Sequence, residues 1–142
     1  MDEREFCRLA PLAGYLALDN ELDRFDYVTE LAFQAPGIPK ACLKEENRVK
    51  ACDSRLWYGL SIADGSVALT VESDSLFVKG LAVILSGLVA KLPVNVLARE
   101  PLGLGALLCR GGFIPPARER GLDELERQVC AFAQQCQNTQ SS

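Results

Sequence analysis

The sequence predicts an α+β fold in which a small antiparallel sheet packs against helices. Three observations support this. Apolar residues recur every third position between Leu22 and Leu31, which is typical of one face of a helix. Apolar side chains occupy every second position along Arg55–Ile62, which is typical of a strand. A nearly continuous apolar stretch then runs to about Ala90 and predicts a long buried helix.

Before the sheet, residues 1–18 have helical apolar spacing that Pro11 and Gly14 interrupt. Asp19 and Asn20 are residue types that cap helix N-termini, so we expect a helix to begin after them, with its apolar residues facing the core. The segment 35–39 reads APGIP and should end that helix. Residues 40–51 are expected to form a charged connector.

The predicted sheet is a hairpin. Asp64-Gly65 is a strong tight-turn signal, and the alternation of residues 67–71 predicts the return strand. Ser73 and Asp74 then stand where they could cap the long apolar helix.

Further short helices should follow the long one. Pro93 fits a first helical turn, and residues 102–110 could form a helix ended by Gly111 and Gly112. Pro115 and Pro116 precede a last helix, whose apolar residues keep seven-residue spacing: Leu122, Leu125, Val129, Phe132 and Cys136. Residues 138–142 are expected to fray. No repeat or linker is visible, so we expect one domain across residues 1–142.

Composition excludes several classes of function. With 15 basic and 19 acidic residues, the chain has a net charge of −4 and no basic cluster, which argues against nucleic-acid binding. No apolar stretch is long enough for a membrane span, and the acidic start does not look like a secretory signal. We therefore expect a cytoplasmic protein that does not bind membranes and whose six cysteines are reduced.

The chain has no histidine, which excludes a Ser-His-Asp triad, a Cys-His pair and histidine metal ligands. No CxxC pair is present, and Gly103-Leu104-Gly105 lacks the context of a phosphate loop. We therefore expect no metal and no bound cofactor. Four cysteines, namely Cys7, Cys109, Cys130 and Cys136, fall in expected helices and resemble small core residues.

Cys42 lies in the connector instead. Cys52 stands where the connector meets the first strand, and loops at strand ends display groups on a rigid base. Arg48, Lys50 and Arg55 favour its thiolate, whereas Asp53 disfavours it. These charges leave both an inert cysteine and a reactive one open.

Four segments, in order, resemble the SufE family of sulfur acceptors for iron–sulfur cluster assembly. Residues 47–57 read NRVKACDSRLW and resemble its active-cysteine motif, with Cys52 at the cysteine. The others are DYVTEL at 26–31, SDSLFVKGL at 73–81 and PARERGL at 116–122. Two positions depart from the family pattern: Ala51 replaces a glycine, and Asp53 stands where glutamine is usual. Because alanine disfavours positive φ, the loop could be set differently.

The resemblance implies a SufE-like and IscU-like fold, with Cys52 as the catalytic residue. Arg118, Asp74, Lys79 and Ser54 are expected to bind the partner or to support the loop. The implied partner is a SufS-type, pyridoxal-phosphate-dependent cysteine desulfurase, which the chain would stimulate, and the implied recipient is an iron–sulfur scaffold. The protein itself should be a monomer or homodimer without pyridoxal phosphate. We expect the resting Cys52 to turn inward, with Leu56 and Trp57 as possible neighbours.

Two alternatives remain: an IscU-type scaffold, and an adaptor that stimulates a desulfurase without carrying sulfur.

Overall fold

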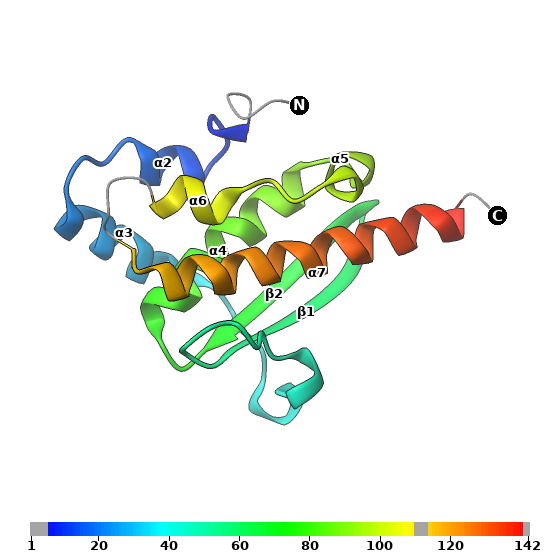
Figure 1. The fold of residues 1–142 in the computed structure, drawn as a ribbon, viewed down its shortest axis with the longest axis horizontal. Coiled ribbons are helices and arrows are strands. Elements are labelled where there is room, and N and C mark those ends of the chain that lie inside the picture. Colours follow the sequence, from blue (N-terminus) through cyan, green and yellow to red (C-terminus); the bar gives the residue numbers. More distant parts are fainter. Residues whose placement is uncertain (1–5, 110–113, 141–142) are drawn as a thin grey trace.

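The structure, a computed structural model, describes residues 6–109 and 114–140. Within them the chain forms one small sheet and several helices, shown in Figure 1. In chain order these are α2 (Leu12–Leu16), α3 (Glu21–Gln34), the 3-10 turns η1 (Lys40–Cys42) and η2 (Glu45–Asn47), β1 (Leu56–Ala63), β2 (Ser66–Ser73), α4 (Leu76–Lys91), α5 (Val94–Arg99), α6 (Leu104–Cys109) and α7 (Pro116–Gln140). The predicted α+β class is confirmed.

The sheet is the predicted hairpin. β1 and β2 pair antiparallel from Leu56 opposite Ser73 to Ala63 opposite Ser66. Asp64 and Gly65 have φ values of 53° and 80°, which is the pattern of a tight turn with both central residues left-handed. The turn chemistry therefore sets the register, and the register carries Val67, Leu69 and Val71 into the core.

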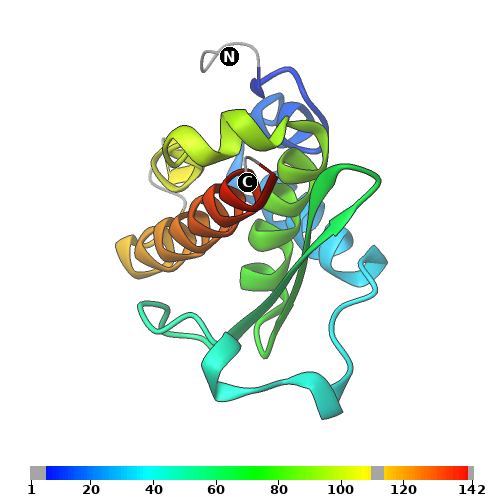
Figure 2. The ribbon, with the colours of Figure 1, turned by 90° about the vertical axis from the view of Figure 1, so that its right-hand side faces the viewer.

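Helix α4 forms the centre of the molecule. β2 packs along it on one side and α3 on another, and Figure 2 shows the hairpin and α7 on opposite sides of α4. Most of its side chains are buried, as expected for a helix that is apolar nearly all round. At Gly80 the backbones of α3 and α4 come so close that a Cβ atom would overlap the carbonyl oxygen of Val28.

The predicted apolar face of α3 is only partly correct. Val28 and Ala32 are buried against α4, but Leu22 and Phe25 are 68% and 48% exposed. The three-residue spacing drifts around the helix, because a helix turns every 3.6 residues, and it carries Leu22 away from the core. The ring of Phe25 stacks instead on Phe77 of α4, with 5.5 Å between ring centroids.

Two predicted caps have different outcomes. The side chain of Asn20 accepts a hydrogen bond from the N–H of Asp23 at 2.8 Å, so the predicted cap of α3 is confirmed. The prediction of Ser73 or Asp74 as the cap of α4 is wrong. Ser75 caps that helix, because both earlier residues bind the backbone of Arg55.

Helix α7 packs against α5 and α6. The buried carboxylate of Glu126 accepts hydrogen bonds from the N–H groups of Gly103 and Leu104, at 3.0 and 2.6 Å, and so fixes the start of α6. The helix expected over residues 102–110 therefore begins at Leu104, and Arg110, Gly111 and Gly112 lie outside the described residues. Helix α7 extends to Gln140, and the fraying expected from residue 138 stays a prediction.

No helix in the described part of the chain is long and apolar enough to cross a membrane.

A partly buried ion pair joins the sheet, α4 and the segment after α3. Lys79, only 8% exposed, lies 3.4 Å from a carboxylate oxygen of Glu72 on β2 and 3.5 Å from the carbonyl oxygen of Ala35. The other oxygen of Glu72 accepts a hydrogen bond from the N–H of Ile38. Lys79 is therefore part of the packing of the fold, and the role expected for it at the site stays a prediction.

We expect Lys79→Met to lower the free energy of unfolding by about 2–3 kcal/mol, because the carboxylate of Glu72 then lacks its cation. Urea unfolding measures this. The double variant Lys79→Met with Glu72→Gln should recover part of the loss, since no unpaired charge remains. Lys44→Met removes an exposed lysine and should leave stability unchanged. Equal stability of the single and double variants would contradict this account.

Candidate functional site

Cys52 lies on a loop of residues 50–55 that leads into β1. The base of this loop is closed by a hydrogen bond from the N–H of Val49 to the carbonyl of Leu56, at 2.8 Å, and by a bridge between Arg48 and Trp57. The loop is therefore a short excursion from a paired backbone. We call residues 50–55 the cysteine loop.

The junction of β2 and α4 holds one end of the cysteine loop. The N–H of Arg55 donates to Asp74 Oδ1 at 3.0 Å, and the N–H of Asp74 donates to the carbonyl of Arg55 at 3.2 Å. The hydroxyl of Ser73 donates to the same carbonyl. These contacts place Asp74 beside the loop as a support, which is one of the two roles expected of it.

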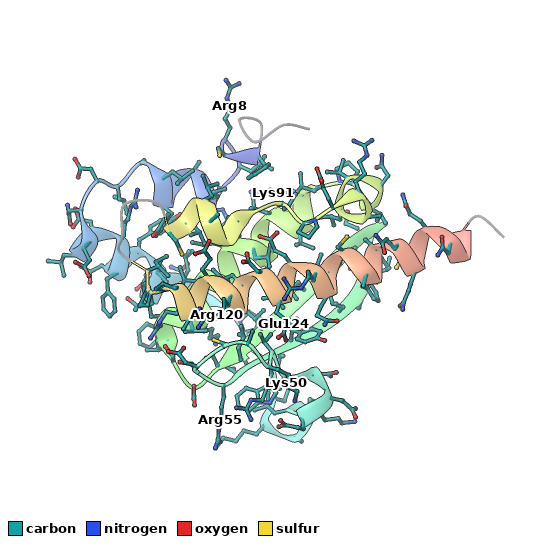
Figure 3. The ribbon with its side chains drawn as sticks, in the orientation of Figure 1. Arg8, Lys50, Arg55, Lys91, Arg120 and Glu124 are labelled. Carbon is teal, nitrogen blue, oxygen red and sulfur yellow. The ribbon has the colours of Figure 1, made fainter. Side chains whose placement is uncertain are left out.

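Helix α7 holds the other end. The N–H groups of Lys50 and Ala51 donate to the two carboxylate oxygens of Glu124, at 2.7 and 2.9 Å. Figure 3 shows Glu124 on the side of α7 that faces the segment carrying Lys50, and Figure 2 shows the cysteine loop beneath the start of α7. The sequence analysis missed Glu124, because contact between residues more than seventy positions apart leaves no local signal.

Cys52 is half-buried between these two attachments and packs against Gly121 of α7. A Cβ atom added to Gly121 would lie 2.8 Å from the Cβ of Cys52 and 3.0 Å from its Sγ. Only glycine leaves room for the cysteine there. The inward turn predicted for Cys52 agrees with this geometry, but its seat is α7. The available signal was a glycine inside a helix, which usually marks close packing.

The surroundings of Cys52 favour the neutral thiol. Burial is the largest cause that raises the pKa of Cys52, and the carboxylates of Asp53 and Asp74 raise it further. The backbone N–H of Ser54 and the positive charge of Arg118 act in the opposite direction and lower it. The Sγ of Cys52 lies 4.0 Å from Asp53 Oδ1, so the thiol can donate weakly to that carboxylate.

Arg118 lies close enough to influence the thiol. Its guanidinium packs over the ring of Phe77, 5.3 Å from the centroid. Its Nη1 atom is buried and has no hydrogen-bond partner among the described residues. A hollow of about 210 Å³ adjoins it, lined by Tyr15, Glu21, Arg24, Phe25, Phe77, Pro115 and Arg118. Arg118 is therefore, after Asp74, the second charged residue from the sequence analysis that lies near Cys52.

The other residues named in the sequence analysis differ in how close they lie to Cys52. The backbone of Ser54 faces the thiol, whereas Lys79 belongs to the ion pair with Glu72 and stands among none of the groups that shift the pKa of Cys52. Cys42 is exposed on η1. Cys109 is half-buried, and burial raises its pKa to about 11. All six cysteines lie within the described residues, and none of them forms a disulfide there.

The described residues contain no group of three or more His, Cys, Asp or Glu side chains that could hold a metal ion. Cys52 offers the chemistry of a thiol on an anchored loop. A thiolate there could attack an electrophilic sulfur that a partner presents.

Comparison with known proteins supports one family. The model of the SufE family, described as an Fe-S metabolism associated domain, matches residues 13–133. The sulfur acceptor protein CsdE of Escherichia coli (strain K12) is 26% identical over 115 residues, which cover 80% of this chain and 78% of that protein. The solution structure of a hypothetical protein from Thermus thermophilus has the same fold, with a TM-score of 0.74 and 21% identity over 97% of this chain and 99% of that one.

The family match spans most of the chain, including the cysteine loop and the part of α7 that holds it, and so this protein belongs to the SufE family.

Proposed function

We propose that this protein is a sulfur acceptor for a cysteine desulfurase in iron–sulfur metabolism, with Cys52 as the accepting group. The observation that carries the proposal is the placement of Cys52 in a SufE-family chain: a loop anchored at both ends, on the surface of the domain and beside Arg118. Relatedness to a protein described as a sulfur acceptor supports the same function.

The transfer step needs only thiol chemistry. The Cys52 thiol first loses its proton. The thiolate then attacks the terminal sulfur of a persulfide held on the desulfurase, so that a bond forms between that sulfur and Cys52 Sγ. The original S–S bond breaks, and its electron pair leaves with the desulfurase cysteine as a thiolate. No net oxidation occurs, and neither a histidine nor a bound cofactor of this chain is required.

The resting site restrains this chemistry. A half-buried thiol with a raised pKa holds little thiolate at neutral pH, because burial disfavours the charge. Docking of the desulfurase would draw the cysteine loop away from α7 and would leave Cys52 in a more polar setting. Arg118, whose charge already lowers the pKa, would remain near the attacking thiolate.

We further propose that the partner is of the SufS type, that the chain stimulates it in the cytoplasm, and that Cys52 passes sulfur on to an iron–sulfur scaffold. Membership of the SufE family favours an acceptor over an IscU-type scaffold. The adaptor alternative keeps one specific observation in its favour, since Asp53 and the burial of Cys52 both suppress the thiolate.

When the protein is mixed with a SufS-type desulfurase and cysteine, the peptide that contains Cys52 should gain one sulfur atom. Intact mass and peptide mapping without reductant measure this. Cys52→Ser should abolish the gain, because a serine hydroxyl cannot form the S–S bond.

The exposed Cys42 provides the matched control, and Cys42→Ser should load normally. If Cys52→Ser still stimulates the desulfurase fully while no sulfur appears on the unchanged protein, the adaptor function replaces the acceptor function.

Titration should also reveal the restraint on the thiol. The rate of Cys52 alkylation by iodoacetamide should rise with pH around a midpoint above the ordinary cysteine pKa of about 8.5. Arg118→Gln should raise that midpoint further, because the neighbouring positive charge is lost. Peptide-resolved mass spectrometry follows Cys52 separately from the other cysteines.

Arg120→Gln is the control, since it removes a charge from the same helix that is not among the causes shifting the pKa of Cys52, and it should leave the midpoint unchanged. A midpoint at or below the ordinary value in the unchanged protein would contradict this description of the site.

A further inference from the structure

Glu124 stands apart from the other residues around Cys52, because neither the SufE resemblance nor any motif singles it out. Its carboxylate binds two consecutive backbone N–H groups, those of Lys50 and Ala51, directly before the cysteine. Hydrogen bonds to a charged acceptor are stronger than neutral ones, and a bidentate arrangement also fixes orientation. One side chain of α7 therefore holds the backbone directly before Cys52.

The two ends of the cysteine loop are held very differently. At Arg55, three hydrogen bonds join the loop to Ser73 and Asp74. These bonds lie directly beside the first residue pair of the hairpin. That end cannot move without disturbing the sheet. At Lys50 and Ala51, by contrast, the attachment to α7 is the carboxylate of Glu124. Loss of this contact would release Lys50 and Ala51 from α7, while Val49 would stay paired with Leu56 and the other end would stay in place.

The same part of α7 also provides the seat of the thiol. Gly121 lies three residues before Glu124, and residues three apart lie on the same side of a helix. Cys52 packs against Gly121 while its two preceding residues bind Glu124. The helix thus presents a recess for the cysteine and, next to it, the group that keeps the loop over the recess.

We propose that Glu124 is a positioning residue that latches the cysteine loop onto α7 and keeps Cys52 seated against Gly121. A partner that takes hold of Cys52 must break the two hydrogen bonds to Glu124, and the loop then pivots at Arg55. The relevance to sulfur transfer rests on the proposed function, but the latch itself is a property of this chain alone.

The side chain of Lys50 does not replace the latch. Its ammonium group binds Glu45 on η2, at 2.8 Å from the carboxylate and 2.9 Å from the carbonyl. It therefore ties the loop to the connector and not to α7. The charges of Glu124 and Lys50 both act on the phenol of Tyr58. Burial is the largest cause that raises the pKa of Tyr58, the carboxylate of Glu124 raises this pKa further, and the ammonium group of Lys50 lowers it.

The test is the rate at which iodoacetamide alkylates Cys52 in the protein alone, resolved by peptide mass. Glu124→Gln keeps the shape of the side chain but leaves one oxygen for two N–H groups, so the latch is weakened. We expect Cys52 to react about tenfold faster at fixed pH, because loss of a charged hydrogen bond shifts the loop toward the open position. The apparent pKa of Cys52 should fall at the same time, since opening removes its burial.

Two controls separate the latch from general loosening of the fold. Glu30→Gln removes an exposed carboxylate on α3 and should not change the rate. The buried Cys130 reports on the whole fold within the same sample, and its alkylation should stay as slow as in the unchanged protein. An unchanged rate at Cys52, or an equal acceleration at Cys52 and Cys130, would overturn the proposal. No desulfurase is present, so a failure of the proposed function would leave this result unaffected.

Discussion

The burial of α4 is the constraint on which the remaining structure depends. Its side chains are apolar nearly all round, so the helix must be covered on several sides to remove that surface from water. The hairpin covers one side, α3 covers another, and the C-terminal helices help to close the rest. This arrangement brings α7 over the start of β1, where the cysteine loop lies. The site is therefore a consequence of how the central helix is covered.

Local chemistry made much of this fold predictable. The hairpin follows from alternation and from an Asp-Gly turn, and the first cap follows from Asn20. Such signals act within a few residues, so they can be read without knowing the tertiary structure. The exposure of Leu22 could not be read in this way, because it depends on how α3 is rotated against α4.

The candidate site was predictable only in its centre. The motif around Cys52 and the charge of Arg118 were visible, whereas Glu124 and Gly121 act through contacts across the fold. Lys79 is the opposite case, because the sequence revealed the residue but not its contact. A lysine in a motif suggested a surface role, but its neighbours across the sheet include Glu72, and burial turned the pair into a structural contact. Pairings between distant elements decide such roles, and sequence spacing does not contain them.

The raised pKa of Cys52 and its placement on a loop both limit the reactivity of the thiol at rest. A permanently exposed, low-pKa thiolate would react with oxidants, and a persulfide on it would be lost to other thiols. Seating the thiol against α7 suppresses both reactions at rest, although it also slows intrinsic attack. The loop resolves this conflict because its start is bound to α7 by one side chain. In the proposed function, reactivity would depend on the partner that opens the loop, and this would confine sulfur exchange to the docked complex.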